Sequence, residues 1–195
     1  MKLSLPDDLA AILRGLDESD REARALLAEL DEERFNARPD ERSWSVAQCL
    51  DHLNVGNRIY LEAMRTAVEE GRRKNVLRQG PFRPRVLERW FIREMEPPPR
   101  RRLPAPRKIV PAARKSRAEV GEEWARIQGQ LRDLLHEAAP LDLNRTRFVN
   151  PFLRLVRFSV GTGFLVIEAH ERRHLWQARQ VLGKLASQGP EGAQA

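Results

Sequence analysis

The chain has 195 residues, with 35 Lys and Arg against 28 Asp and Glu, which gives a formal net charge of +7. This length fits one domain that buries its own core, and a single cysteine, Cys49, excludes an internal disulfide framework. No apolar run is long enough for a membrane span, and residues 1–8 lack a secretory pattern. We therefore predict a soluble, cytoplasmic protein without a membrane partner. It should form a single domain over residues 1–187, followed by a disordered tail over residues 188–195.

The N-terminal segment carries apolar residues at every third or fourth position from residue 4 to residue 30, which predicts a helix. The acidic stretch 17–20 interrupts this stripe. Ser19 and Glu22 fit a capping box, so the pattern is compatible with one long helix or with two helices joined there. A turn should follow around Pro39.

The second predicted helix has the sharpest start in the chain. Ser45 and Gln48 form a capping-box pattern, and the apolar stripe continues to about residue 70. Cys49 lies in this stripe, which favours a small buried residue over a nucleophile. His52 lies at the edge of the stripe and should face inward, either as an ordinary core histidine or as part of a site.

Residues 71–115 differ in composition from the rest of the chain, with fifteen Arg and Lys and three Glu. Their prolines exclude a long helix, so we predict a crossover with one short helix at residues 85–93 and with its aromatic residues packed on the domain. Without a recognition helix, this stretch should not bind nucleic acid. Its arginines, including Arg72, Arg73 and residues 100–102, should rim a site, attract an anionic substrate, or pair with acids of the first helix across a dimer.

Two further helices are predicted, at residues 116–138 and 160–186, with an extended or looped stretch at 140–157 between them. His136 lies near the end of the first of these, where a protonated imidazole favours the helix dipole. Four amphipathic helices with a long connection between the second and the third predict an all-α fold, a four-helix bundle with a long crossover between helices 2 and 3.

The last helix carries two histidines, His170 and His174, four positions apart and therefore on one face. Two imidazoles make an incomplete metal site, so a third ligand must come from His52 or His136, unless the spacing is a coincidence on an amphipathic helix. The residues from His170 to His174 also match H-E-x-x-H, the zinc protease signature in which Glu171 would act as a base. Positions 177 and 180 are glutamines and no further ligand follows, which argues against a protease.

Five short motifs occur in order along the chain: Trp44-Ser45-Val46, Asp51-His52-Leu53, Ala105-Pro106 to Pro111, Asn150-Pro151, and Ala169 to His174 with Gln177. Together they resemble the DinB/YfiT-like superfamily of metalloenzymes over about residues 16–185. The resemblance implies a four-helix bundle, commonly dimeric, whose metal is held by one histidine of the second helix and two of the fourth. These positions are His52, His170 and His174, whereas His136 matches nothing in the family pattern.

The ligands implied by this resemblance suit a divalent ion such as Zn, Ni, Co or Fe, with open coordination positions. Asp51, Glu171 and Gln177 could support the ligands. Asp51 and Glu171 are also the candidate catalytic residues, although a surface or interhelical salt bridge explains Glu171 at least as well as a catalytic base does. The resemblance implies a metal-dependent transferase that joins a small cellular thiol to electrophilic small-molecule substrates, as a homodimer. The alternatives are a metal-dependent hydrolase, and a non-enzymatic binding or stress-response module with a structural or absent metal.

Overall fold

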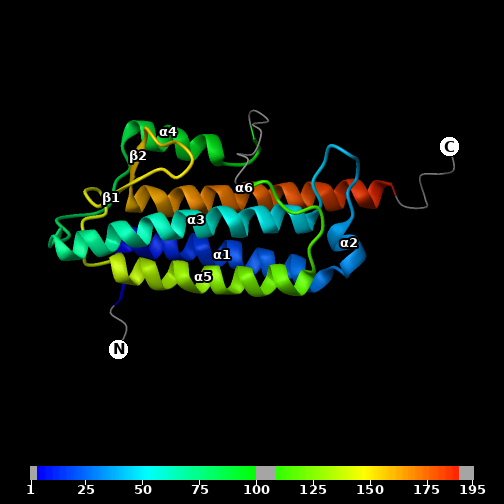
Figure 1. Cartoon of the computed structure of the whole chain (residues 1–195), viewed down its shortest axis with the longest axis horizontal. Coiled ribbons are helices and arrows are strands. Elements are labelled where there is room, and N and C mark those ends of the chain that lie inside the picture. The colour runs from blue at the N-terminus through cyan, green and yellow to red at the C-terminus, as the bar shows by residue number, and fades with distance from the viewer. Residues whose placement is uncertain (1–3, 100–108, 189–195) are drawn as a thin grey trace.

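The computed structural model describes residues 4–99 and 109–188, and the predicted tail over residues 188–195 lies outside this range except for residue 188. The described residues form six helices and one short hairpin (Figure 1). The elements are α1 (Asp7–Glu29), α2 (Glu32–Asn36), α3 (Val46–Arg73), α4 (Val86–Met95), α5 (Arg117–Ala138), β1 (Arg147–Val149), β2 (Arg157–Ser159) and α6 (Val160–Ser187).

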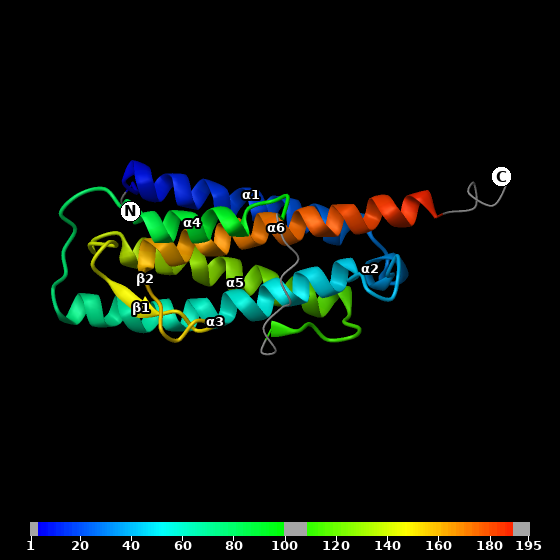
Figure 2. The same cartoon turned by 90° about the horizontal axis from the view of Figure 1, so that it is seen from above.

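The four long helices form the predicted bundle. Helix α3 packs between α5 and α6, and α1 packs between the same two helices on the other side. In Figures 1 and 2, α1 and α6 run in one direction and α3 and α5 run in the opposite direction. The predicted all-α class and the four-helix bundle are therefore confirmed, with the small antiparallel hairpin β1–β2 as an addition.

The long crossover between α3 and α5 follows from the direction of these helices. Because α3 and α5 are parallel neighbours, the chain must return along the bundle, about 33 Å for a helix of the length of α5, before α5 can begin. Helix α4 lies on this return path, packed against α6. It is the short helix predicted at residues 85–93, with slightly different ends. Residues 100–108, which include three of the arginines considered above, lie outside the described residues.

Helix α1 is continuous, so the joint considered near residues 17–20 does not exist. The acidic residues that interrupt the stripe have partners on α5: Arg132 donates to Asp17 at 2.7 Å and to Asp20 at 2.8 Å, and Trp124 Nε1 donates to Asp20 at 2.9 Å. Ser19 is buried within the helix rather than at a cap. Tertiary contacts therefore satisfy the two aspartates that read as a helix break.

The other helix starts agree with the sequence. Ser45 accepts from the backbone N–H of Gln48, whose side chain accepts from the Ser45 N–H, so the predicted capping box is present. Ser116 caps α5, and Ser159, at the end of β2, caps α6 by accepting from the N–H of Thr162. The Ser159 cap joins the hairpin directly to α6, the helix that carries two of the histidines.

The core consists of two apolar clusters, one at each end of the bundle. Each of the four long helices contributes to both clusters, and several buried polar side chains lie between them. We call four of these residues the polar layer, one from each long helix: Ser19, Asn57, Gln128 and Glu171. Since Glu171 lies within the His170 to His174 segment, this layer brings buried polar groups to the level of the histidines.

Two further properties concern the whole of the described chain. Cys49 is a buried free cysteine, as predicted, and burial raises the pKa of its thiol to about 12. Among the described residues, the helices lack the combination of length and apolar character that a membrane crossing requires.

Candidate metal centre

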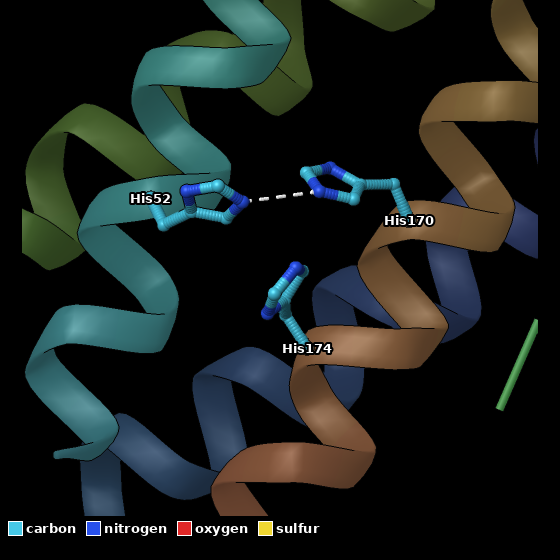
Figure 3. A group of neighbouring side chains, drawn as sticks. All are labelled: His52, His170 and His174. Atoms are coloured by element: carbon cyan, nitrogen blue, oxygen red, sulfur yellow. Dashed lines mark hydrogen bonds between the residues drawn. The ribbon is translucent and has the colours of Figure 1, made fainter. Parts of the chain in front are cut away.

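His52, His170 and His174 meet between α3 and α6, with one ligand nitrogen of each within 4.8 Å of the others. Figure 3 shows His52 reaching across from α3 toward the two histidines stacked along α6. Between His52 and His136, the two candidates for the third ligand, the structure thus selects His52. His136 lies on α5 and is not part of this cluster.

Two hydrogen bonds define which nitrogens are free to bind a metal. His52 Nδ1 donates to the backbone carbonyl of Ile109 at 2.6 Å, and His174 Nδ1 donates to Gln177 Oε1 at 2.9 Å. Because both acceptors are oxygens, each Nδ1 carries the proton and each Nε2 keeps its lone pair. Such partners fix the tautomer and orientation of metal-binding histidines. Gln177 was predicted to support a ligand, whereas the Ile109 carbonyl carries no sequence signal.

The spacing of the nitrogens suits a shared ion. His52 Nε2 and His170 Nε2 are 3.1 Å apart. Two nitrogens bound to one zinc at 2.0–2.1 Å lie about 3.3 Å apart in a tetrahedral site and about 2.9 Å apart at a right angle. Without an ion, the same distance allows the Nε2–H of His170 to donate a hydrogen bond to His52 Nε2. The donor set and its spacing therefore fit a metal ion with little rearrangement.

Burial also keeps the three imidazoles neutral, which metal binding requires. His52 and His174 are only 2% and 8% exposed, and His170 is partly exposed. Burial lowers the pKa of His170 to about 3, with a further contribution from His52, and lowers the pKa of His174 well below its usual value. The pKa of His52 is lowered by burial too, although its hydrogen bond to Ile109 acts in the opposite direction.

The histidines line a cavity of about 900 Å³ that extends along α6. Trp44, just before the α3 cap, forms one wall: its ring lies 5.7 Å from the ring of His174 in a stacked arrangement and 4.9 Å from that of His52. The sequence marked Trp44 only as part of a family motif. Its position shows that this motif also shapes the cavity.

Asp51 lies next to His52 but supports the crossover instead of the cavity. Its carboxylate accepts from the backbone N–H of Ala112 at 3.0 Å and lies 3.9 Å from Lys115 Nζ. Together with the bond between His52 and Ile109, this contact attaches the end of the crossover to α3 beside the candidate ligand. We infer that Asp51 positions the backbone that orients His52.

Glu171 points into the bundle core rather than toward the cavity. Its side chain is fully buried, and Oε1 accepts from Asn57 Nδ2 at 2.7 Å and from Gln128 Nε2 at 2.6 Å. Its two hydrogen-bond donors are amides, not cations, so the interhelical salt bridge considered from the sequence is absent among its described contacts. Neither amide donor was identified from the sequence, because a single Asn or Gln in a helix has no distinctive pattern.

Two of the described crossover arginines, Arg72 and Arg78, pair with acids of the same chain. Arg78 donates to both carboxylate oxygens of Asp8, at 2.6 and 2.8 Å, and Arg72 Nη1 lies 3.6 Å from Glu137. From the sequence we considered that crossover arginines pair with acids of the first helix across a dimer. For Arg78 this pairing occurs inside one chain, with Asp8 of α1.

In comparisons with known proteins, a family model described as the DinB superfamily matches residues 15–178. No curated protein and no solved structure matches the chain. The matched range includes α3 and the part of α6 that holds both histidines, so it contains the whole candidate centre.

Proposed function

We propose that this chain, which belongs to the DinB superfamily, is a metal-dependent transferase that joins a small thiol to an electrophilic substrate. His52, His170 and His174 would hold the ion, which would be Zn, Ni, Co or Fe, with at least one coordination position open to a substrate.

The observation that carries the proposal is the lack of acids in the cavity. Among the described residues that line it there is no Asp or Glu, and Asp51 and Glu171 are engaged elsewhere. A bound metal lowers the pKa of a water from about 15.7 only to about 7, so hydrolysis near neutral pH still gains from a base that takes a proton from the attacking water. A thiol has an ordinary pKa near 8.5, which a bound cation lowers further, so it can react as a thiolate without such a base.

The residues of the chain would have distinct tasks in this reaction. Gln177 and the Ile109 carbonyl hold two of the histidines in the tautomer that binds the ion. Trp44 covers these two rings and excludes water from them. When bound, the ion would supply positive charge that stabilises the thiolate.

The first test is the metal content of purified protein. We expect about one divalent ion per chain, and each of His52→Ala, His170→Ala and His174→Ala should lose it. His136→Ala is the matched control and should retain the ion. Elemental analysis measures this directly, and a His52→Ala protein that keeps its full metal content would contradict the site.

The second test distinguishes a transferase from the alternatives. Thiols, electrophiles and esters should be screened for changes in the melting temperature of the metal-loaded protein, since a ligand at one hundred times its dissociation constant adds about 2.7 kcal/mol of stability. We expect a response to thiols. Metal-dependent ester cleavage without a thiol response would favour the hydrolase, and no response at all would favour a binding module.

A further inference from the structure

The cavity around the three histidines has two chemically different ends. On the side of Val166, its walls come from α3, α4, α6 and the hairpin, and Figure 1 shows α4 and the hairpin together over this half of α6. The side chains here are apolar or aromatic: Tyr60, Phe91, Phe152, Leu153, Val166 and Ile167. The Tyr60 hydroxyl is already bonded to Asn150 at 2.9 Å. We call this region the apolar end.

The opposite side of the cavity is formed by the later part of α6 and by the loop that precedes α3. It contains Arg42, Gln180 and Lys184, with Trp176 and Val181 beside them. Arg173 also lines the cavity, next to His174, and donates to the backbone carbonyl of Glu94 at 3.0 Å. Outside the cavity, the Asp40 carboxylate accepts a hydrogen bond from the backbone N–H of Arg42. The hydrogen bond from Ser43 and the positive charge of Lys184 lower the pKa of Asp40. The negative charge of Asp40 therefore offsets part of the positive charge of this region. Since the described lining has no acid of its own, this region keeps a positive excess. We call it the cationic end.

The histidines lie between the two ends. At 1.5 Å per residue, Val166 and Lys184 are separated by about 27 Å of helix, and His174 is about 15 Å from Lys184 and about 9 Å from Gln180. A cavity of about 900 Å³ is at the upper limit of ordinary ligand pockets, which is enough for two small molecules. An arrangement with a reactive centre between two regions of unlike polarity suits a reaction of two unlike substrates.

We propose that the cationic end binds the anionic groups of the thiol and that the apolar end binds the hydrocarbon part of the electrophile. This assignment rests on the proposed transferase function. The thiol gives up its S–H proton to solvent, its sulfur forms a bond to the electrophilic carbon, and the bond from that carbon to the leaving group breaks with the electron pair on the leaving group. The distances select a thiol whose carboxylates lie on the order of 10 Å from sulfur, a tripeptide-sized molecule rather than a mercapto acid.

The cationic end is tested by measuring how tightly thiols bind to the cobalt-substituted protein, with the visible absorption of the bound cobalt as the signal. The probes are glutathione and its diethyl ester, which differ in two carboxylates. We expect glutathione to bind about fivefold more tightly than the ester, as for one or two partly exposed ion pairs. The Arg42→Gln, Lys184→Gln double variant should abolish this preference and leave ester binding unchanged. An unchanged preference in the variant would overturn the assignment.

The apolar end is tested in the metal-free protein with the uncharged fluorophore N-phenyl-1-naphthylamine. Leu153→Asp should weaken its binding at least tenfold, and Leu153 is 44% exposed, so the fold should tolerate the change. Phe152→Ala is a second variant with the same expected direction, and the double variant of the cationic end is the control that should not change it. If all three variants weaken fluorophore binding equally, or if none of them weakens it, the assignment of the apolar end is refuted.

The two measurements separate this inference from the function on which it rests. If neither thiol alters the cobalt spectrum, the thiol transferase fails and the assignment of the cationic end fails with it. The fluorophore titration, which needs no metal and no thiol, still decides whether the apolar end binds hydrocarbon groups.

Discussion

Replacing Glu171 with glutamine should change how the stability of this protein depends on pH. The carboxyl is fully buried in the polar layer, and burial raises its pKa to about 8, although the hydrogen bonds from Gln128 and Asn57 act in the opposite direction. In the unfolded chain the same carboxyl meets water, with a pKa near 4.5. Between these two values the folded protein retains a proton that the unfolded protein has released.

The sign of the effect follows from this difference in bound protons. A folded state that binds more protons loses stability as pH rises, so the contribution of Glu171 is fully present below pH 4.5 and is lost up to about pH 8. One pH unit corresponds to about 1.4 kcal/mol for a full proton, so the loss amounts to roughly 2 to 3 kcal/mol between pH 5 and pH 7. A carboxylate held by a salt bridge would show the opposite trend.

The assay is urea unfolding of the wild type and of Glu171→Gln at pH 5, 6, 7 and 8 in the presence of a chelator. Glutamine keeps an oxygen that accepts from Asn57 and Gln128, so the two proteins should be similarly stable at pH 5 and the variant should be more stable at pH 7. The three histidines titrate in both proteins and cancel in the difference. Glu122→Gln, at an exposed position on α5, controls for the loss of one acidic group. A difference that stays constant from pH 5 to pH 8 would refute a buried proton on Glu171.

Three other predictions concern the ligands, the assembly and the charge. Gln177→Leu keeps all three histidines but removes the acceptor that orients His174, so competition with a chelator should show a 10- to 100-fold loss of metal affinity. We expect a homodimer that covers the outer face of α4, where Trp90 is 51% exposed, and Trp90→Glu should yield monomers in sedimentation; a variant that remains dimeric would place the interface elsewhere. Short duplex DNA should not bind more tightly than micromolar at 150 mM salt, and a steep salt dependence that weakens on replacing Arg72 and Arg73 with Gln would show the contrary.

Features that depend on neighbours along the chain could be predicted from the sequence. The start of α3 depends on Ser45 and Gln48, three positions apart, and the common face of His170 and His174 follows from the helix repeat. The bundle itself follows from four apolar stripes with 3.6-residue periodicity. The three-residue strands β1 and β2 were not predicted beyond an extended stretch, because so few residues carry no reliable alternation.

Features that depend on contacts between distant segments were decided only by the tertiary structure. The residues alone allowed His52 or His136 as third ligand, and the packing of α3 against α6 selects His52. The acids at Asp17 and Asp20 read as a helix break until Arg132 of α5 pairs with both. The sequence offered Glu171 as a base or as a salt-bridge partner, but the burial that raises its pKa comes from the three other helices around it, whose approach no local pattern encodes.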